Sequence, residues 1–263
     1  MDTVVFLGGG RITSAMLAGL QLGKSRQRLV VHDCSASKLR KLHTKCGVEV
    51  EADLKIAVEQ ADVLVVAVRP DSVRELLEAI GKVTRPLLAV SVAAGVPLRV
   101  LSGELSSPVR WARAMPSPAC RTGHGLTALT FSRASSARDR KCVRDLFACF
   151  GQVLEISENK LDAFTVIYSC THGYHALAAL AAAGQAAGLD RKSALIASAH
   201  ALADGILSWR EGNESLEALL EEAATPGGIA ATTMAGMNAA GYERAVRAGV
   251  RAGLARARAN ARG

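Results

Sequence analysis

The chain has 263 residues, of which 49% are apolar and 4% aromatic, and its formal net charge at pH 7 is +8. This length is typical of two compact domains, and the apolar fraction excludes a mainly disordered chain. The charge does not indicate nucleic acid as a partner, because no aromatic residues are interleaved with it and much of it recurs along one C-terminal stretch. That stretch contains Arg244, Arg247, Arg251, Arg256, Arg258 and Arg262.

No apolar run reaches the roughly 18 uncharged residues of a membrane-spanning helix, and the N-terminus lacks the basic segment of a signal peptide. We therefore expect a cytoplasmic protein without a membrane partner. The six cysteines contain no C-x-x-C pair, so they predict neither a zinc site nor a disulfide framework. We expect no bound metal.

The first half of the chain alternates short apolar runs with helical stretches, as in successive βαβ units. These runs are apolar throughout, which is typical of strands in a parallel sheet that is covered on both faces. The predicted strands are residues 4–7, 29–31, 63–68, 87–92, 109–115, 126–131 and 153–156.

After about Glu158 the strand signals end, and Ala-rich stretches predict helices over residues 165–189, 193–209 and 242–261. The fold class predicted is therefore α/β, with a Rossmann-type dinucleotide-binding domain over residues 1–157 and an all-helical domain over residues 158–263. The small residues from 176 to 187 suit either an ordinary core or a dimer interface. Because the helices are too apolar for a small exposed domain, we expect a homodimer or a multiple of dimers.

A glycine-rich turn, residues 8–13 (Gly-Gly-Gly-Arg-Ile-Thr), follows the first predicted strand and opens a helix. In this context the segment predicts dinucleotide binding. Gly8 permits the tight turn, Gly10 lets the backbone approach a pyrophosphate, and the helix N-terminus attracts the anion. Thr13 replaces the usual Gly or Ala, which affects helix packing more than the phosphate contact. The predicted cofactor contacts in this turn are Gly8, Gly10, Arg11 and Ile12.

Asp33 stands at the end of the second strand, where its carboxylate could bind an adenosine ribose hydroxyl and favour NAD. A role as a helix cap or turn residue is the alternative. Against NAD, the residues Ser35, Ser37, Lys38 and Arg40 follow at once and could hold the 2′-phosphate of NADP. We assign Asp33 and Ser35 to the cofactor site, and the residues leave NAD and NADP both open.

Four further segments, in this order, resemble the pyrroline-5-carboxylate reductase family, which reduces a cyclic imine to proline with NADPH or NADH. They are Ala67-Val68-Arg69-Pro70 (A-V-K-P in the family), Ser91-Val92-Ala93-Ala94-Gly95 (S-x-x-A-G), Arg113-Ala114-Met115-Pro116-Ser117-Pro118-Ala119 (R-x-M-P-N-T-P-A) and Thr225-Pro226-Gly227-Gly228 (S-P-G-G). The resemblance covers nearly the whole chain. It implies a helical dimerisation domain, favours NADPH over NADH, and implies cofactor contacts at Ala67, Val68, Arg69, Pro70, Ala94, Met115, Pro116 and Ser117.

The chain departs from the family in segments that meet at the family's active site. The M-P-N-T-P segment is one residue shorter, so that only Ser117 can replace the family's Asn beside the cofactor. The ring-binding S-G-S-G-P-A-Y segment reads Tyr-Ser-Cys-Thr-His-Gly-Tyr over residues 168–174. Ala230 replaces a Thr whose hydroxyl binds or protonates the substrate. These departures indicate an altered substrate pocket.

The Thr-Pro-Gly-Gly segment at residues 225–228 also predicts a ligand site from its residues alone. Thr is a good N-cap, Pro suits the first helical position, and two glycines leave backbone N–H groups open, so that a carboxylate could bind. A plain helix start is the alternative. The predicted substrate-binding residues are Thr225, Gly227, Gly228 and Ala230.

Hydride transfer to a C=N bond needs a positioned nicotinamide and a proton on the imine nitrogen. His172 is a candidate proton donor because imidazole exchanges protons near neutral pH, whereas a histidine partnered within a helix start is the alternative. Tyr168 and Thr171 are the other catalytic candidates. The sequence thus predicts an NAD(P)H-dependent imine reductase that gives proline or a related cyclic amine. The alternative is a cofactor-binding homologue without turnover that serves as a sensor or partner protein.

Overall fold

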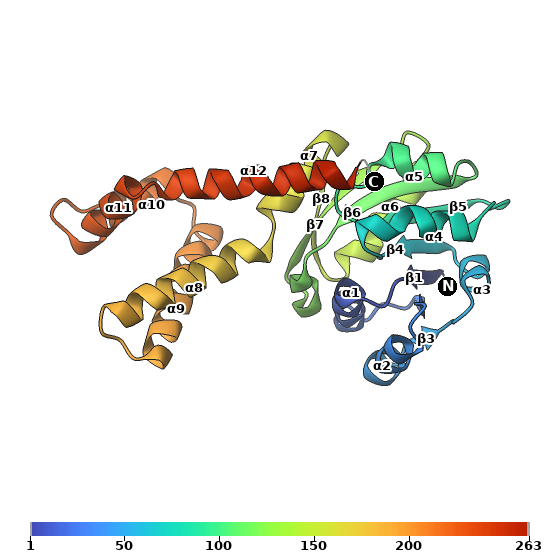
Figure 1. Cartoon of the computed structure of the whole chain (residues 1–263), viewed down its shortest axis with the longest axis horizontal. Coiled ribbons are helices and arrows are strands. Elements are labelled where there is room, and N and C mark those ends of the chain that lie inside the picture. The colour runs from blue at the N-terminus through green and yellow to red at the C-terminus, as the bar shows by residue number, and fades with distance from the viewer. Residues whose placement is uncertain (1, 262–263) are drawn as a thin grey trace. The chain divides into compact units, whose positions relative to one another are not determined.

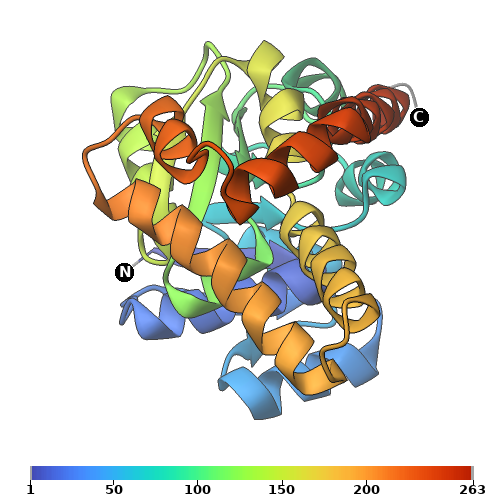
Figure 2. The same cartoon turned by 90° about the vertical axis from the view of Figure 1, so that its left-hand side faces the viewer.

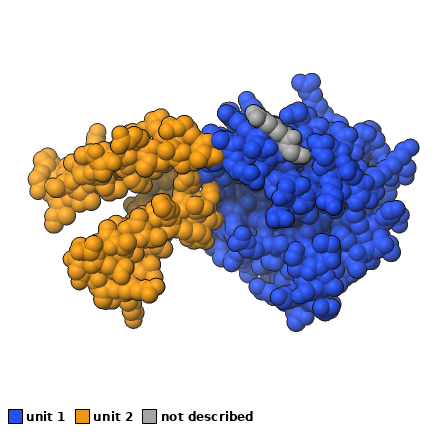
Figure 3. Space-filling model, in the orientation of Figure 1, with its two compact units in different colours: residues 1–168, 253–263 blue, residues 169–252 orange. Residues whose placement is uncertain are grey.

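In the computed structural model, which describes residues 2–261, the chain divides into two compact units. The first contains the chain up to Tyr168 together with the residues from Gly253 onward, and the second contains residues 169–252 (Figure 3). The domain boundary that we predict between residues 157 and 158 stays a prediction.

The described residues of the first unit form an eight-stranded sheet with the order β3-β2-β1-β4-β5-β6-β7-β8 (Figure 1). Neighbouring strands from β3 to β6 are parallel, β7 is antiparallel to β6, and β8 is parallel to β7. The strands are β1 (Thr3–Leu7), β2 (Arg28–His32), β3 (Glu49–Val50), β4 (Val63–Val66), β5 (Leu87–Ser91), β6 (Val109–Met115), β7 (Gly125–Phe131) and β8 (Gly151–Glu155).

Apolar side chains of the sheet enter a separate core on each face. In β1, Val4 and Phe6 join one buried cluster, whereas Val5 and Leu7 join the other. Helices α1, α2 and α6 contribute to the first cluster and α3, α4 and α5 to the second, which explains why the central strands are apolar throughout. These helices are α1 (Arg11–Leu22), α2 (Ala36–Cys46), α3 (Leu54–Glu59), α4 (Val73–Ile80), α5 (Leu98–Glu104) and α6 (Ala137–Ala148).

The single helix predicted over residues 165–189 is wrong. Helix α7 (Glu158–Ile167) ends before Tyr168, and α8 (Cys170–Ala186) begins after Ser169. Tyr168 is the C-cap of α7, and Ser169 is the N-cap of α8, where its hydroxyl accepts a hydrogen bond from the Thr171 N–H at 3.3 Å. Two short 3₁₀ helices, η1 (Pro70–Ser72) and η2 (Pro118–Thr122), and the edge strand β3 were also not predicted.

The second unit is all-helical and has little core of its own. Helices α8 and α9 (Arg191–Glu211) lie side by side, and a Cβ added at Gly184 would lie 3.3 Å from that of Ala194 (Figure 2). The unit continues with α10 (Leu216–Ala223), α11 (Ile229–Ala239) and the first part of α12 (Tyr242–Asn260). Its buried residues among those described are Ala181, Ala194 and Ser198. Within the described residues, none of the helices is long and apolar enough to cross a membrane.

The end of α12 packs on the loop after β5 within the first unit. Gly95 has a φ of +80°, and a Cβ there would lie 2.4 Å from the carbonyl oxygen of Ala257. The Asn260 side-chain amide donates to the Ala94 carbonyl at 3.2 Å. Gly95 is therefore needed for this close approach, which gives a physical reason for the glycine that ends the S-V-A-A-G segment.

Candidate functional site

The glycine-rich turn lies at the carboxyl ends of β1 and β4, where its conformation requires glycine. Gly8 has a φ of +109°, and a Cβ there would lie 2.8 Å from the Ala67 carbonyl oxygen. The buried Thr13 hydroxyl donates to the Gly8 carbonyl, which ties α1 to the turn. Thr13 thus has a structural role at the position where the motif usually has Gly or Ala.

The start of α1 fits the pyrophosphate of a dinucleotide. Gly10 is the N-cap residue and no side chain caps the helix, which also lacks an acidic residue in its first turn. No protein atom lies within 4 Å of a Cβ built at Gly10, so that space beside the helix end is open. Unpaired N–H groups and the positive end of the helix dipole face this space.

Asp33, directly after β2, is held by both neighbouring loops. Its Oδ2 accepts from the Gly9 N–H and its Oδ1 from the Ser35 N–H, each at 2.8 Å, and Lys38 Nζ lies 3.1 Å from Oδ2. Burial alone would raise the pKa of Asp33, but these N–H groups and the ammonium together hold the pKa below its usual value. Ser35, not Asp33, caps α2.

Three segments predicted to bind the cofactor follow three neighbouring parallel strands. Residues 67–70 follow β4, Ala94 lies in the loop after β5, and residues 115–117 include the last residue of β6 and the two that follow it. Because parallel strands end at the same edge of a sheet, the first unit gathers all the predicted cofactor residues there. They are Gly8, Gly10, Arg11, Ile12, Asp33, Ser35, Ala67, Val68, Arg69, Pro70, Ala94, Met115, Pro116 and Ser117.

Tyr168 is fixed at this same edge by two hydrogen bonds. Its hydroxyl oxygen accepts from the Leu126 N–H at 2.6 Å and from the Ser117 hydroxyl at 3.3 Å. Ser117 is 5% exposed and also accepts from the Ala119 N–H at 3.2 Å. Because the phenol oxygen accepts both hydrogen bonds, the phenol O–H can donate to a third group.

Arg113 attaches α7, which leads to Tyr168, to the sheet. Its guanidinium is 2% exposed and lies 3.2 Å from a Glu158 carboxylate oxygen and 3.3 Å from one of Asp162. Glu158 also accepts from the Leu98 N–H at 2.6 Å. The sequence identified Arg113 only as part of a motif, since nothing local indicates carboxylates that lie 45 and 49 residues away.

The remaining predicted residues belong to the second unit. Thr171 and His172 lie in the first turn of α8. Gly228 is the N-cap of α11, Gly227 has a φ of +76°, and Ala230 is the second residue of that helix.

The prediction that Thr225 caps a helix with Pro226 at its first position is wrong. The Thr225 hydroxyl turns back to the Glu222 carbonyl at 3.3 Å, and its own carbonyl accepts from the Gly228 N–H at 2.9 Å. The four residues therefore form a turn between α10 and α11.

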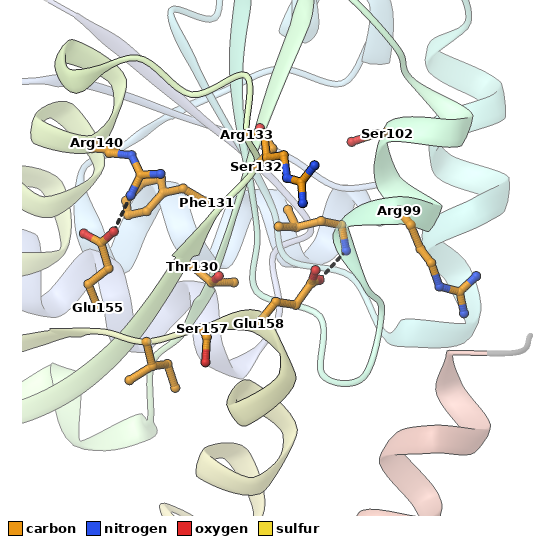
Figure 4. A pocket seen from close by; sticks show the side chains of 12 residues that line it. Arg99, Ser102, Thr130, Phe131, Ser132, Arg133, Arg140, Glu155, Ser157 and Glu158 are labelled. Carbon is orange, nitrogen blue, oxygen red and sulfur yellow. Dashed lines mark hydrogen bonds and ion pairs between the residues drawn. The ribbon is translucent and has the colours of Figure 1, made fainter.

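A cavity of about 730 Å³ lies elsewhere in the first unit, between α5, the end of β7 and the start of α7 (Figure 4). Arg140 pairs with Glu155 across part of it and lies 4.8 Å from the Phe131 ring centroid. The backbone N–H of Leu98 donates to Glu158. None of the predicted site residues lines this cavity.

Two family models match separate parts of the chain. Residues 3–95 match the family model described as NADP oxidoreductase coenzyme F420-dependent, and residues 158–260 match that described as pyrroline-5-carboxylate reductase dimerisation. The pyrroline-5-carboxylate reductase of Mycobacterium leprae is 32% identical over 212 residues, which are 77% of this chain and 72% of the relative. The chain belongs to the pyrroline-5-carboxylate reductase family.

Other members of the pyrroline-5-carboxylate reductase family agree over most of the chain. The Arabidopsis thaliana enzyme is 30% identical over 243 residues, covering 89% of this chain and 86% of the relative. A Plasmodium falciparum pyrroline carboxylate reductase structure with NADP bound has a TM-score of 0.88 at 21% identity, covering 99% and 98% of the two chains. The predicted resemblance and the predicted fold class, a Rossmann-type domain followed by a helical dimerisation domain, are confirmed.

Proposed function

We propose that this protein is an NAD(P)H-dependent imine reductase that acts on pyrroline-5-carboxylate or a related cyclic imine and gives proline or the related cyclic amine. Membership of the pyrroline-5-carboxylate reductase family supports this function. The observation that carries it is the open, uncapped start of α1 at Gly10, which fits a dinucleotide at the edge where the family's segments meet.

We assign the three parts of the cofactor to three groups of residues. The turn at residues 8–12 would hold the pyrophosphate, Asp33 and Ser35 would contact the adenosine end, and residues 67–70, 94 and 115–117 would contact the nicotinamide end. When bound, NADPH or NADH supplies the hydride that reduces the C=N bond. The protein's contribution is to position the two reacting carbons and to bring a proton to the nitrogen.

Tyr168, Thr171 and His172 are the groups that we propose for proton delivery. The contacts of Tyr168 support its role, because both hydrogen bonds are received by its oxygen and its O–H remains to donate. Thr171 and His172 follow closely in the chain, at the start of α8. His172 provides an imidazole, a side chain that can donate or accept a proton.

The α10–α11 turn is the site that we propose for the substrate carboxylate. Gly227, with its positive φ, and Gly228, the N-cap without a side chain, leave the first N–H groups of the 11-residue helix α11 without a side-chain cap. Thr225 and Ala230 flank this helix start. Ala230 has no hydroxyl, so this chain would bind the substrate with one hydrogen bond fewer than a member with Thr.

We further propose a homodimer, or a multiple of dimers, built from the second unit and located in the cytoplasm. The unit exposes many large apolar side chains while it buries few, and it matches the family's dimerisation domain. Examples are Ile206 at 57%, Trp209 at 49% and Leu220 at 47% exposed. All six cysteines are free, which is consistent with a reducing compartment.

The test is oxidation of NADPH and of NADH with a panel of cyclic imines that do or do not carry a carboxylate. We expect turnover with at least one carboxylated ring and less with its uncarboxylated counterpart. Ala230 and the changed segment at residues 168–174 favour a second candidate function, a cofactor-binding homologue without turnover. Tight cofactor binding without oxidation by any imine would support that second function and contradict the first.

A further inference from the structure

The adenosine end of the proposed cofactor site contains an ion pair between Asp33 and Lys38. The Asp33 side chain is 6% exposed, whereas that of Lys38 is 53% exposed, and the Lys38 ammonium lies 3.1 and 3.3 Å from the two carboxylate oxygens. The partly exposed ammonium therefore covers the buried carboxylate on its solvent side.

Asp33 is already used to hold the fold at this point. Its two oxygens accept the N–H groups of Gly9 and Ser35, which join the glycine-rich turn to the loop before α2. Both oxygens are thus engaged before any ribose hydroxyl arrives. The same contacts keep the carboxylate ionised, since they hold the pKa of Asp33 below its usual value although burial opposes this.

A permanent negative charge at this place would repel a cofactor that carries a 2′-phosphate, because the phosphate bears between one and two negative charges near neutral pH. Lys38 cancels that charge and can turn toward the phosphate, since about half of its side chain is exposed. Its backbone is fixed meanwhile, because the Lys38 N–H donates to the Ser35 hydroxyl that caps α2.

We propose that Lys38 sets the cofactor preference: it neutralises Asp33 and binds the 2′-phosphate, so that the site accepts NADPH as well as NADH. This role rests on the function proposed above, and the contact with Asp33 selects Lys38 from the four residues after Asp33 that could hold a 2′-phosphate. It identifies the 2′-phosphate as the part of the cofactor that Lys38 distinguishes.

The test measures the dissociation constants of NADPH and NADH by the change in nicotinamide fluorescence on binding, without substrate. Lys38→Met should weaken NADPH about ten-fold or more, as expected for loss of a charged hydrogen bond and exposure of a like charge, and should change NADH by less than about three-fold. Lys45→Met is the matched control, because it removes the same charge from the last turn of the same helix and should leave both constants unchanged.

A second variant separates neutralisation from simple support of the helix. Asp33→Asn added to Lys38→Met removes the unbalanced charge, so that it should recover a substantial part of the lost NADPH affinity. Equal weakening of both cofactors by Lys38→Met, or an unchanged ratio of the two constants, would overturn the role of Lys38 and leave the proposed function intact. A folded wild-type protein that binds neither cofactor would overturn the proposed function as well.

Discussion

Gly8 is closely packed against the backbone of Ala67, whereas the space beside Gly10 is open. Substitutions at these two positions should therefore have different effects. A Cβ at Gly10 meets no protein atom within 4 Å, so we expect the fold to persist in Gly10→Val while the side chain fills the pyrophosphate space and weakens NADPH binding at least about ten-fold. Gly8→Ala meets the Ala67 carbonyl at 2.8 Å in a left-handed conformation and should instead lower thermal stability. Fluorescence titration and thermal unfolding distinguish them, and unchanged NADPH affinity in folded Gly10→Val would refute the site.

Tyr168→Phe should lower kcat by about a hundred-fold if the phenol delivers the proton, with a smaller change in KM. The variant also leaves the Leu126 N–H without its acceptor, so some loss of stability is expected. Tyr242→Phe is the control, because it removes the same hydroxyl from a tyrosine that is 53% exposed at the start of α12. Steady-state kinetics that show an unchanged kcat in Tyr168→Phe would remove Tyr168 from the catalytic group.

Ala230→Thr tests whether the changed pocket still serves pyrroline-5-carboxylate. If the carboxylate site is otherwise unchanged, the added hydroxyl should raise kcat/KM on that substrate by about ten-fold. Because residues 117 and 168–174 differ as well, we expect no improvement and a pocket of different shape. High wild-type activity on pyrroline-5-carboxylate, with no gain from Thr, would show that these departures do not alter the substrate.

The contacts of Tyr168 and Arg113 could not be predicted from the sequence, because their partners lie far away along the chain. By contrast, Gly8 and Gly10 are predictable as cofactor contacts, because the spacing of glycines between a strand and a helix is a local feature of the sequence. Tyr168 meets partners 42 and 51 residues away, and only the packing of α7 on the sheet brings them together. Likewise, the sequence does not reveal that the Lys38 side chain points toward Asp33, and the role proposed for Lys38 depends on this direction.

Helix α6 is attached to β6 by a partly buried ion pair that makes stability depend on pH. Arg110 Nε lies 2.8 Å from an Asp139 carboxylate oxygen, and Ser136 completes a capping box at the helix start. Burial alone would raise the pKa of Asp139, but Arg110 and Ser136 lower it to about 2. A lowered pKa gives stability that is present above the unfolded value near 3.9 and lost as the pH falls toward 2.

Asp139→Asn should therefore reduce the free energy of unfolding by about 2 kcal/mol at pH 7 and by about half as much at pH 3. Urea unfolding at the two pH values measures both differences. Asp145→Asn, on the same helix but with a side chain 62% exposed, is the control and should change little. A deficit of equal size at both pH values would show that the carboxylate charge does not stabilise α6.

The strands were predictable from the sequence where apolar residues follow one another in short runs. The apolar runs of β1, β4 and β5 identified a covered parallel sheet because both faces of these strands are buried. The break at Tyr168 and Ser169 was missed, since Ala-rich helical composition continues across it and the capping contact of Ser169 is a single hydrogen bond. The start of α11 was placed too early because Thr225-Pro226 has the composition of a helix start.

The second unit cannot bury its apolar side chains alone, and this makes the assembly testable. We expect light scattering at micromolar concentration to give a dimer or a multiple of dimers. Ile206→Glu replaces an exposed apolar side chain of α9 with a charged one. This variant should weaken the assembly and therefore lower the thermal stability. A stable wild-type monomer at this concentration would contradict the role proposed for the unit.

Transfer of deuterium from NADPH that carries deuterium at both C4 positions of the nicotinamide tests hydride transfer most directly. With pyrroline-5-carboxylate or the most active cyclic imine of the panel, we predict one deuterium in each molecule of amine formed, on the carbon of the former C=N bond, and one NADP⁺ for each amine. Cofactor that binds at the Gly10 turn but transfers no label to any imine would contradict the assignment as an imine reductase.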